Sequence, residues 1–389
     1  MTPAPADEGE LIAALADDQG RFELLAGGTK RDYGRPVAGA TPLSLARFSG
    51  IRAYEPEELV LTCGAATPLA EIEALLATKS QMLAFEPPDW RALWGASGRQ
   101  TLGGVLACNL GGPRRIKAGA ARDHLLGFRA VSGHAQAFKA GGRVVKNVTG
   151  YDLCKIMCGS FGTLAALTEV TVKVLPAPET ARTLAVEGLD DGAAIALLAR
   201  AAGSPLDVSG LAHLPRGIAD VRALTALRLE GTTASVAARL ESLERLAEPH
   251  GALARLDHAA SQALWRKIGD AEFLCRHVGP LWRVSIAPSH GPRYVAALKI
   301  AGARHYYDWS GGLVWLALPP APGAHAAMVR GALAPLGGHA TLIRAEAAIR
   351  TKVPVFEPEA PGLAALARRL KDSFDPERKL NPGRMTSDA

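Results

Sequence analysis

The chain has 389 residues, of which 48% are hydrophobic, 5% aromatic and 21% charged, and its 44 Lys and Arg residues outnumber 38 Asp and Glu to give a net charge of +6. This composition is that of a globular protein with room for two or three domains, and it excludes a disordered or collagen-like chain. The basic residues are spread along the chain and no aromatic cluster alternates with them, so the pattern favours a small anionic ligand or partner over nucleic acid.

The cysteines and the apolar segments indicate the compartment. Five irregularly spaced cysteines are too few for a disulfide framework, which indicates a reducing environment. The first twenty residues carry acids and no basic segment ahead of an apolar one, so we expect no signal peptide. The longest uncharged stretch, 309–329, contains three prolines that would break a membrane helix. We therefore expect a cytoplasmic protein, at most held at the inner face of the membrane through a complex.

The first 76 residues predict a small unit of mixed helices and strands. Apolar residues at helical spacing predict a helix over 8–15. Thr67 and Pro68 provide the cap and the first-turn proline of a second helix that ends near Leu76. Strands are expected at 21–26, 43–47, 50–54 and 58–65.

Glycine density rises sharply after this unit. The stretch 95–113 contains six glycines in nineteen residues, so something other than their side chains must lie against this backbone. Further strands are predicted at 125–133, 135–140 and 167–176, and Pro176 and Pro178 place the end of the first domain near residue 178.

The remainder predicts a second domain and a returning tail. Residues 180–350 alternate strand-like and helical runs, which favours an α/β domain built on an antiparallel sheet. Near the end of the chain, apolar residues at helical spacing predict an amphipathic helix whose apolar face needs a core to pack against. These residues are Leu363, Leu366, Leu370 and Phe374. We therefore predict an α+β chain divided into 1–178, 179–360 and 361–389.

Three polar glycine loops are the strongest functional signal. The loop 25–34 follows a strand, so its amides can converge on an anion, but it matches neither GxxxxGK(S/T) nor GxGxxG, and alone it could equally be a plain turn. Segment 95–109 combines glycine backbone with hydroxyl and amide donors, which suits a buried pyrophosphate, and segment 144–176 adds further polar side chains and a second loop of small residues. The candidate residues are Gly27, Gly28, Thr29, Lys30, Ser97, Thr101, Gly103, Gly104, Asn109, Lys146, Asn147, Gly150, Tyr151, Asp152 and Gly162.

The order and the amino-acid sequences of these segments resemble those of a known family. Five segments are similar to the FAD-binding domain of the vanillyl-alcohol-oxidase (PCMH) type: GGTKRDYG, QTLGGVLACNLGGP, RDHLLG, KNVTGYDLCKIMCGSFGTL and the terminal LNPGR. With GPRRIKAGAARDHLLG, they resemble in particular the FAD-binding E subunits of bacterial glycolate oxidase (glycolate dehydrogenase). The resemblance covers about 20–178 and the last fifteen residues, and the middle domain only by size and position.

The resemblance implies a two-part FAD-binding domain followed by a cap domain. The diphosphate is expected between 27–30 and 95–109, the adenine near Glu169 and Val170, and Asn381 beside the isoalloxazine. Lys30 and Gln100 stand where related proteins place a tethering residue, so we expect non-covalent FAD, with Cys108 as an alternative tether.

Four arginines are candidates for holding an anionic substrate. Arg114 and Arg115 could grip the FAD phosphates or a carboxylate, with a solvated or partner-facing loop as an equal alternative. For Arg344 and Arg350, a surface ion pair with Glu346 is favoured over a substrate clamp.

Three functions remain open at this stage. The resemblance implies a subunit whose flavin accepts or relays electrons from 2-hydroxyacid oxidation, between a catalytic FAD subunit and an iron–sulfur subunit. The alternatives are a self-sufficient FAD-dependent 2-hydroxyacid dehydrogenase and a non-catalytic assembly subunit. No histidines occur at metal-ligand spacing, where related dehydrogenases carry a metal-binding segment, so we expect no metal and doubt independent substrate oxidation.

Overall fold

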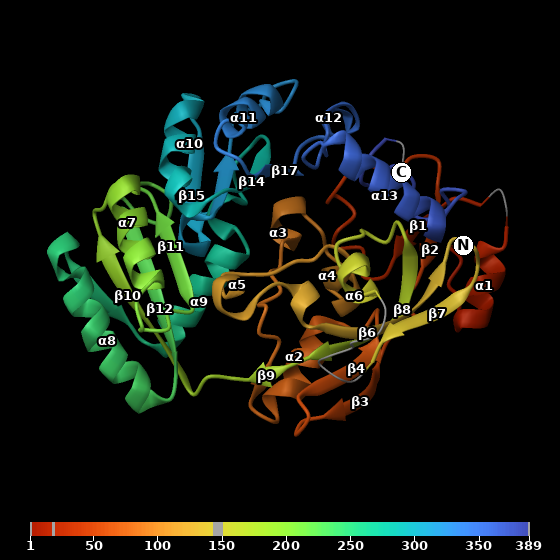
Figure 1. Cartoon of the computed structure of the whole chain (residues 1–389), viewed down its shortest axis with the longest axis horizontal. Coiled ribbons are helices and arrows are strands. Elements are labelled where there is room, and N and C mark those ends of the chain that lie inside the picture. The colour runs from red at the N-terminus through yellow and green to blue at the C-terminus, as the bar shows by residue number, and fades with distance from the viewer. Residues whose placement is uncertain (1, 18–19, 143–150, 388–389) are drawn as a thin grey trace.

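The computed structural model describes residues 2–17, 20–142 and 151–387, and two sheets organise them (Figure 1). We call residues up to 176 the N-terminal half and residues 180–344 the cap half. The five-stranded sheet ends at Lys173 and the eight-stranded sheet begins at Thr180. The predicted domain division at residue 178 falls between these strands and stays a prediction.

The N-terminal half is built on an antiparallel sheet of five strands in the order β3-β4-β8-β6-β7. The strands are β3 (Ile51–Glu55), β4 (Val60–Gly64), β6 (Leu125–Ser132), β7 (Ala137–Gly141) and β8 (Ala165–Lys173). Two short pairs flank it: β1 (Phe22–Leu25) runs parallel to β2 (Thr41–Ser44), and β5 (Gln81–Met82) pairs with β9 (Leu175–Pro176). The expected strands are confirmed, although the last is divided between β8 and β9.

Short helices connect these strands. They are α1 (Glu8–Leu15), α2 (Leu69–Ala77), α3 (Arg91–Trp94), α4 (Leu102–Ala107), α5 (Arg115–Ala118) and α6 (Leu153–Met157). The prediction that Thr67 caps α2 is wrong, because Pro68 occupies the cap position. The Thr67 hydroxyl instead donates to the Gly64 carbonyl at 2.7 Å and accepts from Gly50 N at 2.9 Å, which fixes the turn before the helix.

The cap half is an antiparallel sheet of eight strands in the order β13-β10-β12-β11-β15-β16-β14-β17, as the alternating pattern predicted. The strands are β10 (Thr180–Glu187), β11 (Gly210–Leu214), β12 (Leu224–Gly231), β13 (Leu253–Leu256), β14 (Leu281–Ser285), β15 (Arg304–Asp308), β16 (Leu313–Ala317) and β17 (His339–Arg344). The helices are α7 (Asp191–Ala202), α8 (Thr233–Ala247), α9 (His258–Gly269), α10 (Gly291–Leu298) and α11 (Ala326–Leu333).

Alternation along the cap strands decides which side chains meet the N-terminal half. Tyr307 and Val314 face a core shared with α7, α8, α10 and α11, whereas Tyr306 and Trp315 on the opposite face belong to the core of the N-terminal half. One continuous hydrophobic core therefore joins the two halves across this face of the cap sheet.

The chain ends against the N-terminal half, beside β1 (Figure 1). After α12 (Ala347–Lys352) and α13 (Pro361–Phe374), the fully buried Asp375 accepts hydrogen bonds from Lys371 Nζ at 2.7 Å and from Leu380 N at 2.9 Å. The expectation that the whole stripe of α13 docks is wrong. Only its last turn packs on the core, and Leu363 remains 60% exposed.

Candidate functional site

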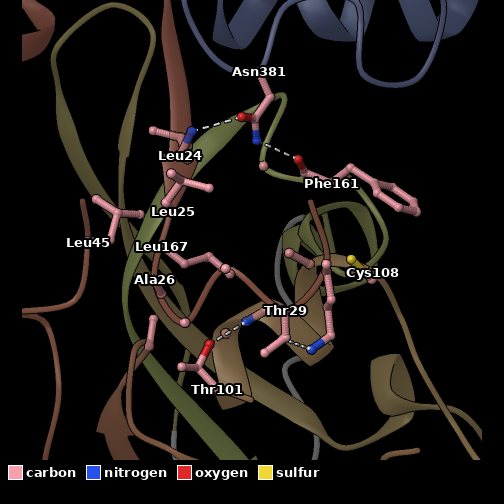
Figure 2. A pocket seen from close by; sticks show the side chains of 18 of the residues that line it. Leu24, Leu25, Ala26, Thr29, Leu45, Thr101, Cys108, Phe161, Leu167 and Asn381 are labelled. Atoms are coloured by element: carbon pink, nitrogen blue, oxygen red, sulfur yellow. Dashed lines mark hydrogen bonds between the residues drawn. The ribbon is translucent and has the colours of Figure 1, made fainter. Parts of the chain in front are cut away.

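A cavity of the N-terminal half lies where the first two predicted loops meet the C-terminal tail. Its walls come from the end of β1, the loop 26–31, α4, the turn at 161–162 and the tail. Figure 2 shows Thr29, Thr101 and Cys108 toward one end and Asn381 between Leu24 and Phe161 toward the other.

The glycines of the two loops divide into packing and lining positions. A Cβ on Gly27 would stand 1.7 Å from the Arg99 carbonyl oxygen, and one on Gly98 would stand 1.7 Å from the Gly27 carbonyl oxygen. These two segments therefore touch backbone to backbone. Gly104 differs, because its nearest neighbours are the Thr101 hydroxyl at 3.2 Å and the side chain of Lys30 at 3.9 Å. The bare backbone of Gly104 widens the cavity beside Lys30.

Lys30 brings a positive charge into the cavity wall. Its Nζ donates to Thr29 Oγ1 at 3.2 Å and to Gln100 Oε1 at 3.1 Å, and no carboxylate lies within 4.0 Å of it among the described residues. Burial lowers the pKa of this ammonium group to about 8. A buried cation held only by neutral oxygens is costly by itself and becomes favourable when an anion enters.

The C-terminal tail forms another part of the wall (Figure 2). Asn381 Oδ1 accepts from Leu24 N at 2.9 Å, and its Nδ2 donates to the Phe161 carbonyl at 2.8 Å. Arg384, which is 4% exposed, also lines the cavity and donates to Glu23 Oε1 at 3.0 Å. Asn381 therefore fastens β1 to the turn at 161–162. Arg384 and Glu23 did not emerge from sequence reasoning, although Arg384 stands in the LNPGR segment that did.

Toward the cap half, the cavity wall is aromatic. The ring of Tyr33 lies 4.9 Å from that of Phe161 and 5.8 Å from those of Trp90 and Trp94, measured between centroids. Burial raises the pKa of Tyr33 to about 12, so its hydroxyl stays neutral. Trp90 in turn contacts Trp315 of β16 at 5.2 Å. Sequence reasoning missed this cluster, because it assembles only when β16 packs on the N-terminal half.

The predicted ligand-contacting residues fall into three groups. Those that line the cavity are Gly27, Gly28, Thr29, Lys30, Thr101, Gly103, Gly104, Gly162 and Asn381. Ser97, Asn109, Tyr151, Asp152, Glu169 and Val170 lie outside its lining. Lys146, Asn147 and Gly150 lie outside the described residues.

The residues outside the lining have other positions in the structure. Asp152 caps α6 by accepting from Lys155 N, and Asn109 Oδ1 accepts from Arg122 N at 3.2 Å. Val170 is fully buried in β8, and Tyr151 is 93% exposed. Contacts of these residues with a ligand stay predictions.

Three of the four candidate arginines hold the protein together. Arg114 donates to Glu230 at 2.7 and 3.0 Å, and Arg344 donates to main-chain carbonyls, including that of Cys275 at 2.8 Å. Arg350 pairs with Asp32 at 2.6 Å rather than with the expected Glu346.

Arg115 is the exception. Its side chain has no hydrogen bond or ion pair in the part of the chain that the structure describes, and its guanidinium lies 4.7 Å from the centroid of Trp309. Within the same described residues, no group of three His, Cys, Asp or Glu could hold a metal ion, and no helix is long and apolar enough to cross a bilayer.

Comparisons with known proteins agree with this geometry. The sequence family described as "FAD binding domain" matches residues 2–141. The chain is 34% identical over 379 residues to glycolate oxidase subunit GlcE of Escherichia coli (strain K12), an alignment that spans 97% of this chain and 95% of that protein. The chain therefore belongs to the family of this glycolate oxidase subunit. It is an FAD-dependent oxidoreductase of the glycolate oxidase subunit type, with FAD as its cofactor, as the resemblance predicted.

Other relatives extend the comparison to the fold. Glycolate oxidase subunit GlcD of Bacillus subtilis (strain 168) is 34% identical over 149 residues, covering 38% of this chain and 30% of that protein. The structure of an alkyldihydroxyacetonephosphate synthase matches with a TM-score of 0.69 at 16% identity, over 97% of this chain and 76% of that one. This match confirms the α+β architecture with its FAD-binding domain.

The residues of the cavity fit the diphosphate of FAD. Lys30 is a buried cation with no carboxylate within 4.0 Å among the described residues, and the charge of Asp89 acts on it only from farther away. Gly104 leaves room beside Lys30, and the hydroxyls of Thr29 and Thr101 lie in the same wall. Cys108 also lines the cavity, and burial raises the pKa of its thiol to about 11, which keeps it protonated near neutral pH.

Proposed function

We propose that this chain is the FAD-binding subunit of a glycolate-oxidising complex, in which non-covalently held FAD accepts or relays electrons from 2-hydroxyacid oxidation toward an iron–sulfur subunit. The observation that carries the proposal is Lys30 in the wall of the cavity between the two glycine loops and the tail. It supplies a buried positive charge at a place where the bare backbone of Gly104 leaves room for a phosphate. Similarity over nearly the whole length of a glycolate oxidase subunit supports the choice of complex.

The chain's own residues have distinct parts in this proposal. Lys30 and Thr29 hold the diphosphate, and Asn381 keeps the wall of the cavity closed by joining β1 to the turn at 161–162. Tyr33 and Phe161 place a dry aromatic wall toward the cap half. When bound there, FAD supplies reversible acceptance of two electrons.

The remaining parts of the proposal follow from the resemblance and the fold. The chain divides into an FAD-binding domain (1–178), a cap domain (179–360) and a C-terminal segment (361–389) that returns to the flavin. Its partners are a catalytic FAD subunit and an iron–sulfur subunit, and the substrate class is a small 2-hydroxyacid. We place the complex in the cytoplasm, with any contact to the inner membrane face made through these partners.

Emptying the flavin site in the intact complex tests the redox role. Gly104→Leu directs a bulky side chain into the cavity beside Lys30, while Gly331→Leu is the matched control, since a Cβ at Gly331 meets nothing within 4 Å. Flavin is released with acid, identified by mass spectrometry, and counted per complex. We expect the Gly104 variant to assemble but to lose one FAD and the transfer of electrons from glycolate, and the control to keep both.

Three results would contradict the proposal or part of it. A wild-type complex in which this chain carries no flavin would remove the redox role. Full glycolate oxidation by an assembled Gly104→Leu complex that lacks this flavin would instead assign the chain to assembly alone. Flavin that stays attached to the chain after acid precipitation would refute non-covalent binding.

A further inference from the structure

Two arginine side chains converge on one tryptophan between the halves of the molecule. The guanidinium carbons of Arg115 and Arg283 each lie 4.7 Å from the centroid of the Trp309 ring. Arg115 begins α5 in the N-terminal half, and Arg283 lies in β14 of the cap sheet. Trp309 joins the halves, because its indole Nε1 donates to the Gly112 carbonyl at 3.1 Å.

Neither guanidinium forms an ion pair within the part of the chain that the structure describes, although Asp123 and Asp308 act on Arg115 and Arg283 from farther away. Among the described residues, no carboxylate lies within 4.0 Å of Arg115 or Arg283, and Arg283 Nε is buried without any hydrogen-bond partner. Asp308, whose charge acts on Arg283, is itself engaged by Trp309 N at 2.7 Å, and burial raises the pKa of this carboxyl to about 7. Two neighbouring cations therefore remain largely uncompensated in a partly buried place, which proteins otherwise avoid.

Other arginines of the molecule that stack on tryptophan show the contrast. Arg228 lies 4.7 Å from the ring centroid of Trp265 and pairs with Glu86 at 2.8 Å. Arg330 lies 5.1 Å from that of Trp282 and pairs with Glu357 at 3.3 Å. A carboxylate completes each of these sites, whereas none of the residues that the structure describes pairs with the arginines at Trp309.

The backbone at Trp309 is held in an unusual conformation. Trp309 has φ +51° and Ser310 has φ +59°, a region that residues with a Cβ adopt rarely and only under strain. The surrounding contacts maintain this turn between β15 and β16. Such strain accumulates at sites where a side chain must be placed for a ligand.

Through its neighbours, Arg283 links the group of Arg115, Arg283 and Trp309 to the cavity lined by Lys30 and Tyr33. On β14 it shares the strand face of Leu281, which packs in the common core of the two halves, and it stands directly opposite Trp315 of β16. Trp315 contacts Trp90, which contacts Tyr33 in the cavity wall. The charges of Arg283 and Tyr33 are also close enough for each to influence the pKa of the other.

We propose that Arg115 and Arg283, placed against Trp309 at the junction of the two halves, bind the carboxylate of a small 2-hydroxyacid. The planar guanidinium groups present paired donors that match the two oxygens of a carboxylate, and the ligand supplies the missing negative charge. This inference deepens the proposed function, on which it rests for the 2-hydroxyacid class. It assigns recognition of the acid to this chain and to Arg283, a residue outside the four arginines singled out in the sequence.

Calorimetric titration of the FAD-containing full chain with glycolate tests the site without relying on turnover. Arg283→Met is the main variant, and Arg283→Lys keeps the charge but loses the planar fork. Arg330→Met is the matched control, because Arg330 also stacks on a tryptophan but has its own carboxylate. We expect the dissociation constant for glycolate to rise at least tenfold in Arg283→Met, several-fold in Arg283→Lys, and less than twofold in the control.

Each outcome decides for or against the site. Loss of glycolate binding in both Arg283 variants, with binding retained by the control, supports it. No measurable binding to the wild-type chain, or unchanged binding in Arg283→Lys and Arg115→Met, would overturn it even if Arg283→Met failed to fold. Inorganic sulfate binding as tightly as glycolate would overturn the assignment to carboxylates. A chain without flavin would count against the proposed function alone, since the heat of glycolate binding is measured independently of flavin.

Discussion

Replacing Lys30 by methionine should change stability and cofactor binding in opposite directions. In the cavity without a bound anion, burial lowers the pKa of Lys30 from 10.5 to about 8. At 1.36 kcal/mol per pKa unit, this shift corresponds to a destabilisation of about 3 kcal/mol at neutral pH, as an upper bound. Lys30→Met removes that charge and keeps most of the side-chain volume, so we expect the flavin-free protein to become more stable.

The same change should weaken FAD binding. A charge-assisted hydrogen bond contributes about 1.5–3 kcal/mol, so loss of the Lys30 contact to a phosphate should raise the dissociation constant of FAD by roughly 10- to 100-fold. Urea unfolding of the flavin-free chain measures the first effect, and fluorescence titration with FAD measures the second. Lys267→Met provides the control, because Lys267 is half exposed on α9, where it pairs with Glu272 at 3.7 Å.

The pH dependence gives an independent check on Lys30. Between pH 8 and 10.5 the unfolded chain holds more protons on this lysine than the folded chain does, so the unfolding free energy of the flavin-free protein should rise across this interval. Lys30→Met should flatten that rise. A variant that binds FAD as tightly as the wild type, or that is less stable without flavin, would refute the assignment of Lys30 as the buried anion-binding cation.

Three further substitutions test other parts of the structure. Gly98→Ala should lower thermal stability sharply and by far more than Gly104→Ala, because its Cβ would stand 1.7 Å from a backbone oxygen, whereas the Gly104 variant should mainly weaken FAD binding in a fluorescence titration. Asn381→Ala should cost about 1–3 kcal/mol in urea unfolding, since it leaves a partly buried N–H and a partly buried carbonyl unpaired, and Asn381→Asp should cost less because it keeps the acceptor. Asp270→Asn should raise stability at pH 7 by about 1–3 kcal/mol, because burial raises the pKa of Asp270 to about 6 and the folded protein therefore loses stability between pH 4 and 6.

The sequence predicted local structure better than it predicted contacts between distant segments. The helix over 8–15 and the strands of the N-terminal half follow from short-range periodicity, and the structure confirms them within a few residues. The glycine loops likewise showed where a cofactor belongs. The pairing of Gly27 with Gly98, by contrast, depends on two segments seventy residues apart. No periodicity distinguishes a glycine required by neighbouring backbone from one that opens toward a ligand.

Long-range packing also explains the residues that sequence reasoning missed. Tyr33 and Arg384 gain their place in the cavity only when β1, the cap sheet and the tail come together. Arg283 is the one charged residue of β14, and only the alternation of this strand relative to the N-terminal half shows which core it faces. For α13 the sequence predicted more packing than the structure shows. Amphipathic spacing does not tell how many turns of a helix pack against the same chain.

The adjacent residues Arg114 and Arg115 both lie at the junction between the halves, but only Arg114 is paired with carboxylates of the described residues. Arg114 and Arg228 are neutralised by Glu86 and Glu230, and this network ties the N-terminal half to β12. Burial would raise the pKa of Glu230, but the charge of Arg228 and the hydrogen bonds from Arg114 lower it to about 2, so the network stays ionised over the physiological range. The next residue, Arg115, turns instead to Trp309 and meets no acid among the described residues. Because the same interface provides carboxylates where arginines only join the halves, the uncompensated pair at Trp309 is better explained by a negative charge that arrives with a ligand than by a requirement of folding.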